Sequence, residues 1–264
     1  MALDRPRSDV SQSPLDAAWR VALIVVVYCV MAVPLDLLSS KHSPLTSILI
    51  CLVTGAGYAL ISLPLARRLP YPMGTRFLAI FVPLYWIGQL SNLVEAWFDT
   101  TFPHSQLIGG AIILAVPLAV TSLLIALLLK ADPAVQPVPR IHELLGRRPL
   151  LSWAWRILVA GILFAVVLQL AGTLWGPVIS RYYRDPAFVA QAHTANPPDY
   201  VFWPEETVRG ILFALVLLPV LAVMRGRDWR SLLVLGGYVA LLNAVIEGWL
   251  PMLSMTAFPL QFRL

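Results

Sequence analysis

Seven long runs of apolar residues dominate this chain of 264 residues. A helix needs about 20 mostly apolar residues to cross the ~30 Å hydrocarbon core of a lipid bilayer, and each run has about that length. A soluble domain of this size also needs more polar surface than 59% hydrophobic and 12% charged residues supply. We therefore expect an integral membrane protein with seven spans, at residues 18–38, 45–65, 77–98, 107–129, 152–178, 207–224 and 231–254.

The composition of these runs favours helices over a β-barrel. Leu, Ala and Val follow one another without the alternation of polar and apolar residues that is typical of a barrel strand. Every backbone amide inside lipid must be hydrogen-bonded within the protein, and a helix achieves this within each segment. The sequence therefore predicts an all-α, multi-pass protein of the cell membrane.

Basic residues are distributed unevenly between the predicted loops. Cytoplasmic loops are generally richer in Lys and Arg than loops on the other side of a membrane. If the N-terminus is inside, the inner segments hold 14 and the outer segments 5 of the 19 Lys and Arg residues. This pattern predicts an N-in, C-out topology. It also explains the net charge of +5 as a topology signal, so we expect no nucleic-acid partner.

Short sequence matches indicate an internal repeat. The tripeptide Ala-Trp-Arg opens the first run at residues 18–20 and the fifth run at residues 154–156. Asn, Glu and Trp recur near the ends of the third and seventh runs. These matches predict two parallel three-helix repeats joined by a connecting helix. The expected units are residues 1–130 (first repeat and connecting helix), 131–150 (cytoplasmic Pro-rich linker) and 151–264 (second repeat, with a long outer loop at 179–206).

Each predicted repeat carries an amide and a carboxylate in its last apolar run. Asn92 and Glu95 are three residues apart, and Asn243 and Glu247 are four apart, so each pair shares one helix face. Gln89 extends the polar stripe of the third run through the same ~120° sector. Ionisable groups inside apolar spans are costly and mark ion, proton or substrate paths. We expect the two glutamates to face a shared axis as titrating acids, with the asparagines orienting them.

The same side chains fit a plainer interpretation. Both glutamates lie toward the outer ends of their spans, where carboxylates can reach water or lipid headgroups. Trp97 and Trp249 beside them are typical of the aromatic belt at a membrane interface. Changing Glu95 and Glu247 to Gln separates the two interpretations, because only the functional one predicts loss of activity.

A second group of charged residues opens the sixth run, in the segment Pro-Glu-Glu-Thr-Val-Arg-Gly at residues 204–210. Acids in a first helical turn and an i,i+4 pair of Glu205 with Arg209 are ordinary helix chemistry. The segment also resembles the paired-glutamate motif of the CAAX-processing and bacteriocin-processing intramembrane proteases. That resemblance implies a hydrolase in which Glu205 activates water and Arg209 orients it. The interval to Arg209 is one residue shorter than in that family, and no histidine follows His193 to match its later motifs.

No nucleotide-binding, flavin-binding or thiol-redox motif occurs in the chain, and its outer histidines lack partners at metal-ligand spacing. We therefore expect no cofactor or metal. The main prediction is a membrane protein that binds or transports a small solute, ion or lipid headgroup, with the bilayer and a proton or cation as further partners. The alternatives are the hydrolase and a non-catalytic assembly or sensor subunit. The predicted site lies in the outer half of the bundle and consists of Glu95, Glu247, Asn92, Asn243, Gln89, Glu205, Glu206 and Arg209.

Overall fold

The computed structural model describes residues 14–39, 43–131, 146, 149–183, 199–223 and 236–242. These residues form helices and short connections, with no strand among them, and the all-α prediction is confirmed for this part of the chain. A short helical segment covers residues 236–242. The longer elements are α1 (Pro14–Ser39), α2 (Pro44–Arg67), α3 (Met73–Tyr85), the π-helical turn η1 (Trp86–Leu90), α4 (Ser91–Asp99), α5 (His104–Leu128), α7 (Leu150–Tyr183) and α9 (Asp199–Val223).

Five helical stretches are long and apolar enough to cross a membrane: Leu15–Leu38, Pro44–Arg67, Met73–Asp99, His104–Leu128 and Leu150–Leu174. They match the first five predicted spans and fit a multi-pass helical membrane protein. The sixth predicted run falls in α9, and most of the seventh lies outside the described residues. The predicted outer loop at 179–206 is helical at both ends, because α7 continues to Tyr183 and α9 begins at Asp199.

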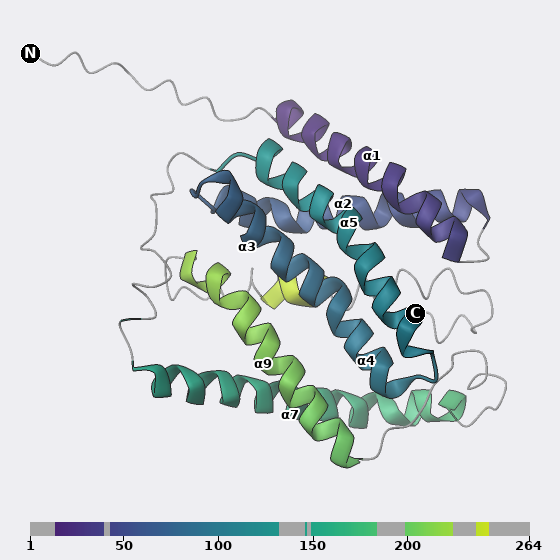
Figure 1. Ribbon diagram of the computed structural model, residues 1–264, viewed down its shortest axis with the longest axis vertical. Helices are drawn as coiled ribbons and strands as arrows, with labels where there is room; N and C mark the ends of the chain where they lie inside the picture. The colour runs from purple at the N-terminus through teal and green to yellow at the C-terminus, as the bar shows by residue number, and fades with distance from the viewer. Residues whose placement is uncertain are drawn as a thin grey trace, which may run out of the picture.

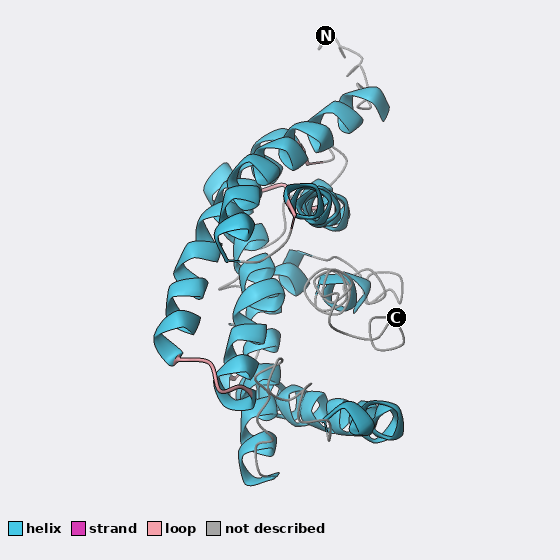
Figure 2. Ribbon diagram, turned by 90° about the vertical axis from the view of Figure 1, so that its right-hand side faces the viewer, coloured by secondary structure: helices cyan, strands magenta, loops and turns pink. Residues whose placement is uncertain are grey.

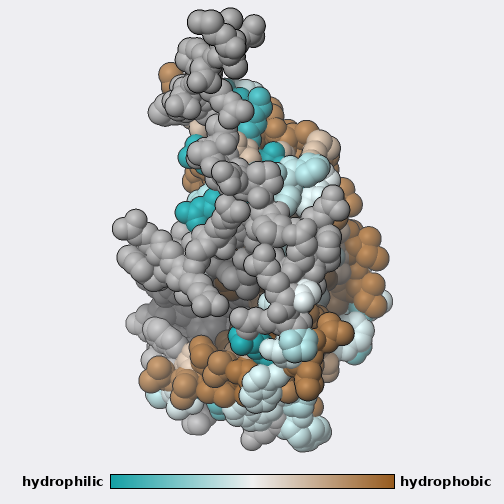
Figure 3. Space-filling model, turned by 90° about the vertical axis from the view of Figure 1, so that its left-hand side faces the viewer, coloured by the Kyte–Doolittle hydropathy of each residue, from teal (hydrophilic) through white to brown (hydrophobic). Residues whose placement is uncertain are grey.

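The helices form two layers. In Figure 1, α1, α5, α3 with α4, and α9 run side by side, and α2 and α7 cross behind them, as the side view in Figure 2 shows. The closest helix pairs are α1 with α2 and α7 with α9. Exposed apolar residues cover the outer helices. Figure 3 shows a band of hydrophobic residues at the foot of one face of the molecule. Leu150, Leu151 and Trp155 of α7 are among the exposed apolar residues.

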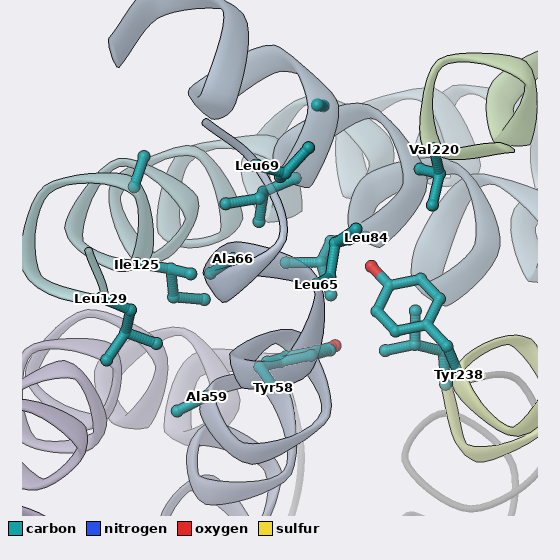
Figure 4. Packing of buried hydrophobic residues seen from close by; sticks show 14 of the residues in the cluster. Tyr58, Ala59, Leu65, Ala66, Leu69, Leu84, Ile125, Leu129, Val220 and Tyr238 are labelled. Carbon is teal, nitrogen blue, oxygen red and sulfur yellow. The ribbon is translucent and has the colours of Figure 1, made fainter. Parts of the chain in front are cut away.

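The buried core lies between α2, α3 and α5. Tyr58, Leu84 and Ile125 are each 0% exposed and belong to one hydrophobic cluster. Val220 of α9 and Tyr238 of the segment 236–242 pack into the same cluster (Figure 4). Segments from the two ends of the chain therefore share one core.

A π-helical turn interrupts the third predicted span. Pro83 removes one backbone donor near the end of α3, and η1 follows at Trp86–Leu90. A π-helical turn adds a residue to the helical repeat and rotates the side chains that follow, and such turns often occur at functional sites. Gln89 within this turn bonds to α2, whereas Glu95 bonds to α9. The single polar face predicted from Gln89 to Glu95 is thus divided between two neighbouring helices.

Two arginines donate hydrogen bonds to the carbonyl groups at the C-terminal ends of α2 and α5, on one side of the molecule. Arg20 of α1 donates to the carbonyl of Leu128 at 2.5 Å. Arg76 of α3 donates to the carbonyl of Ala66 at 3.3 Å and to that of Leu129. Cations stabilise helix C-termini because the last carbonyls of a helix have no partner within it. We call this group, Arg20 and Arg76 with the carbonyl ends of α2 and α5, the arginine end.

Candidate functional site

Arg209 of α9 lies at the centre of the candidate site, and its side chain is 5% exposed. Its Nη1 donates to Glu206 Oε1 at 2.5 Å, and its Nη2 donates to Glu95 Oε2 at 2.9 Å. Both Nη2 and Nε donate to the hydroxyl of Ser91, at 3.0 and 3.3 Å. One guanidinium thus joins α9 to the start of α4. A planar group with five donors is well suited to such a position.

Two further carboxyl groups, those of Glu205 and Asp99, lie beside this network. Glu205 is 7% exposed and Glu206 is 4% exposed. Glu205 Oε1, Glu206 Oε2 and Asp99 Oδ1 are buried and have no hydrogen-bond partner within the described part of the chain. Asp99 also interacts electrostatically with Glu205 and with Arg209. We call Glu95, Asp99, Glu205 and Glu206, together with Arg209, the acid cluster.

Two glycines hold α9 against α7 immediately behind Arg209. A Cβ atom on Gly210 would lie 2.8 Å from the Cα of Gly161 and 2.6 Å from the Cβ of Phe164. A Cβ on Gly161 would lie 2.6 Å from the carbonyl oxygen of Thr207. Only glycine fits such a close approach of two backbones. The Arg-Gly pair therefore has two roles, because Arg209 bonds to α4 while Gly210 packs on α7.

The structure brings together part of the predicted site. Glu95 meets Arg209 and Glu206 in the acid cluster, although these residues come from two different predicted groups. Gln89 lies apart and donates to the hydroxyl of Tyr58 at 3.3 Å. Asn92 is half-buried on α4. Asn243 and Glu247 lie outside the described residues, so the pairing of Glu95 with Glu247 stays a prediction.

Ser91 is a site residue that the sequence did not predict. Its side chain is fully buried and accepts two hydrogen bonds from Arg209. A single serine in an apolar run is common in helix packing and gives little signal by itself. The available signal was its spacing, because Ser91 is four residues before Glu95 and therefore on the same face of α4.

Among the residues that the structure describes, no three His, Cys, Asp or Glu side chains are grouped so that they could hold a metal ion. His104 instead stacks on Trp97 at the turn between α4 and α5, with ring centroids 3.7 Å apart. The carboxyl groups of the acid cluster can still exchange protons, since this needs no convergent geometry.

No protein-family model, curated protein sequence or solved structure matches this chain. The resemblance to the paired-glutamate proteases therefore rests on the short segment 204–210 alone. Within that segment, Arg209 bonds to Glu206 rather than to Glu205. The function has to be inferred from the acid cluster itself.

Proposed function

We propose that this chain is a multi-pass membrane protein that moves a small solute or ion across the bilayer, and that the acid cluster binds and releases a proton during this process. Glu205 holds the proton beside the ion pair of Arg209 with Glu206. Glu95 connects the cluster to water, because its side chain is 48% exposed. The observation that carries the proposal is the burial of both Glu205 and Glu206 around a single arginine.

Electrostatic cost supports a proton at this site. Burying an ionised carboxylate costs tens of kcal/mol in the idealised case and still several kcal/mol after relaxation. Arg209 offsets this cost for Glu206 and Glu95, to which it bonds directly. Its single charge cannot also balance Glu205 and Asp99. Binding a proton is the least costly way to keep the remaining carboxyl groups inside the protein.

The two ends of the molecule support an orientation with the N-terminus in the cytoplasm. The exposed residues Arg67, Arg68 and Lys130 lie at the ends of α2 and α5, on the side of the arginine end. The acid cluster lies at the opposite end of the α3–α4 stretch. By the positive-inside rule the arginine end faces the cytoplasm, and the acid cluster lies toward the outer surface.

Infrared difference spectroscopy tests the proton site directly. The full-length protein is placed in lipid nanodiscs and the pH is stepped, and the carbonyl-stretch band of protonated carboxylic acids is followed. We expect the wild type to show such a band from a buried acid, and Glu205→Gln to remove or clearly diminish it. Asp16→Asn is the control, because Asp16 forms an ion pair with Arg20 far from the cluster. Identical spectra for the wild type and Glu205→Gln would overturn the proposal.

A paired-glutamate hydrolase is the second candidate, because the buried Glu205 Oε1 has no hydrogen-bond partner in the described structure and can accept a hydrogen bond from a water. Such an enzyme works in detergent, whereas a carrier gives a signal only across a sealed membrane. Hydrolysis by the solubilised protein would therefore favour the enzyme. An assembly or sensor subunit, the third candidate, predicts that Glu95→Gln and Glu205→Gln leave function unchanged.

A further inference from the structure

The arginine end lies where four helices begin or end. Nη2 of Arg76, at the start of α3, reaches the carbonyl oxygens of both Ala66 and Leu129. The residues that follow these two, Arg67 and Lys130, are therefore held near the same guanidinium group. The start of α1 is bound to the end of α5 at this place, and Figure 1 shows the start of α1, the start of α3 and the end of α5 on the same side of the molecule.

Positive charge exceeds negative charge at this end. The described cations here are Arg20, Arg67, Arg68, Arg76 and Lys130. The described acid is Asp16, which already pairs with Arg20 at 2.7 Å. These residues carry five positive charges and one negative charge, a net of +4. Counting Asp132, which lies outside the described residues, leaves a net of +3.

Three of these cations are exposed at the surface. Arg67, Arg68 and Lys130 form no ion pair with any residue that the structure describes. In contrast, Arg20 and Arg76 donate to helix carbonyls. Like charges held near one another repel, and a bound anion offsets that repulsion. We call Arg67, Arg68 and Lys130 the basic surface.

The chemistry of the basic surface fits a phosphate group. A guanidinium group donates two parallel hydrogen bonds to phosphate oxygens, and an ammonium group adds a compact positive charge. Arg67 and Arg68 supply the first kind of group, and Lys130 supplies the second. Basic clusters next to membrane helices bind the headgroups of anionic lipids through these contacts.

Exposed apolar side chains near the cations favour a lipid over a soluble phosphate compound. Leu60 of α2 is 55% exposed and lies seven residues before Arg67, about two helical turns, so the two share one helix face. Trp19 of α1 is 50% exposed and lies next to Arg20, and Trp is enriched at the depth of lipid headgroups. A phospholipid places its phosphate at the cations and its acyl chains along such apolar faces.

We propose that the basic surface binds the phosphate headgroup of an anionic phospholipid, with an acyl chain against the exposed apolar face of α2. The bound lipid joins the end of α2 to the end of α5 and offsets charge that no described residue balances. This inference requires only that the helices span a membrane, so it does not depend on the proton proposed for the acid cluster.

Native mass spectrometry of the full-length protein in detergent tests the site, with phosphatidylglycerol and phosphatidylcholine as the two probes. We expect phosphatidylglycerol to bind more tightly. Each Lys or Arg near an anionic lipid adds severalfold to its affinity, so Arg67→Gln/Arg68→Gln should weaken phosphatidylglycerol binding about thirtyfold, or ~2 kcal/mol. Arg156→Glu is the matched control, because it changes the net charge by the same two units at an exposed position of α7, which packs mainly on α9.

Two further variants keep the test decisive if the double Gln variant aggregates. Lys130→Gln should weaken phosphatidylglycerol binding about fivefold, or ~1 kcal/mol. Arg67→Lys/Arg68→Lys keeps both charges and should retain the preference for phosphatidylglycerol. Equal affinity of the wild type for the two lipids, or an equal loss of affinity in Arg156→Glu and the double Gln variant, would overturn the proposal.

Glycerol 3-phosphate distinguishes a lipid site from a site for a soluble phosphate compound. It carries the phosphate without acyl chains, so we expect it not to displace phosphatidylglycerol at equal concentration. Displacement by glycerol 3-phosphate would contradict the lipid site and show that the basic surface recognises the phosphate alone.

Discussion

The arginine end and the acid cluster carry buried charge in different ways. At the arginine end, Arg20 and Arg76 bond to helix carbonyls, and Asp16 pairs with Arg20 at 2.7 Å. At the acid cluster, four carboxyl groups share the single cation of Arg209. Arginine keeps its charge at any physiological pH, whereas carboxyl groups change theirs by binding a proton. Under the proposed function, the charges of Arg20 and Arg76 are fixed, whereas the buried carboxyl groups around Arg209 switch.

Removing the central cation of each end should show this contrast most strongly. Arg209→Leu leaves Glu206 buried with no counter-ion, and breaking one partner of a buried pair typically costs about 3–5 kcal/mol. Arg20→Leu removes a cation from a helix C-terminus, which costs about 1 kcal/mol. Thermal unfolding in detergent measures both. Equal losses of stability would mean that the two ends do not differ in the way proposed.

The glycine contact behind Arg209 should give the next largest effect. Gly161→Ala places a methyl group against the backbone of Thr207, and overpacking of this kind costs about 1–3 kcal/mol. Gly172→Ala, on the same helix α7, adds a methyl group where nothing lies within 4 Å. We expect the first variant to lower the unfolding temperature and the second to leave it unchanged. A similar shift in both would contradict the close contact of α7 with α9.

The smallest effect on stability is expected at Glu95. Its side chain is 48% exposed, and ion pairs that reach water contribute about 0–1 kcal/mol. Glu95→Gln should therefore unfold almost as the wild type does, whereas Glu206→Gln should be clearly less stable because the side chain of Glu206 is 5% exposed. Unfolding curves of both variants under the same conditions would sharpen the distinction between the rim of the acid cluster and its interior.

The first five apolar helices could be predicted from the sequence because helix length and apolar composition are local properties. The end of α4 and the start of α9 were also predicted to carry charged site residues. Their meeting could not be predicted, since Glu95 and Arg209 are 114 residues apart and only helix packing brings them together. The hydrogen bond of Gln89 to Tyr58 could not be predicted either, since it joins the π-helical turn to another helix, α2. No simple sequence pattern predicts a π-helical turn.

The most direct test of the central claim is a count of the protons that the protein binds between pH 9 and 6 in a lightly buffered sample with a pH indicator. Exposed carboxyl groups do not titrate in this range, since their usual pKa values are about 4. If the acid cluster holds an exchangeable proton, Glu205→Gln binds about one proton fewer than the wild type, and Asp16→Asn binds the same number. If Glu205→Gln binds as many protons as the wild type, the buried acids carry fixed charge and the central claim is wrong.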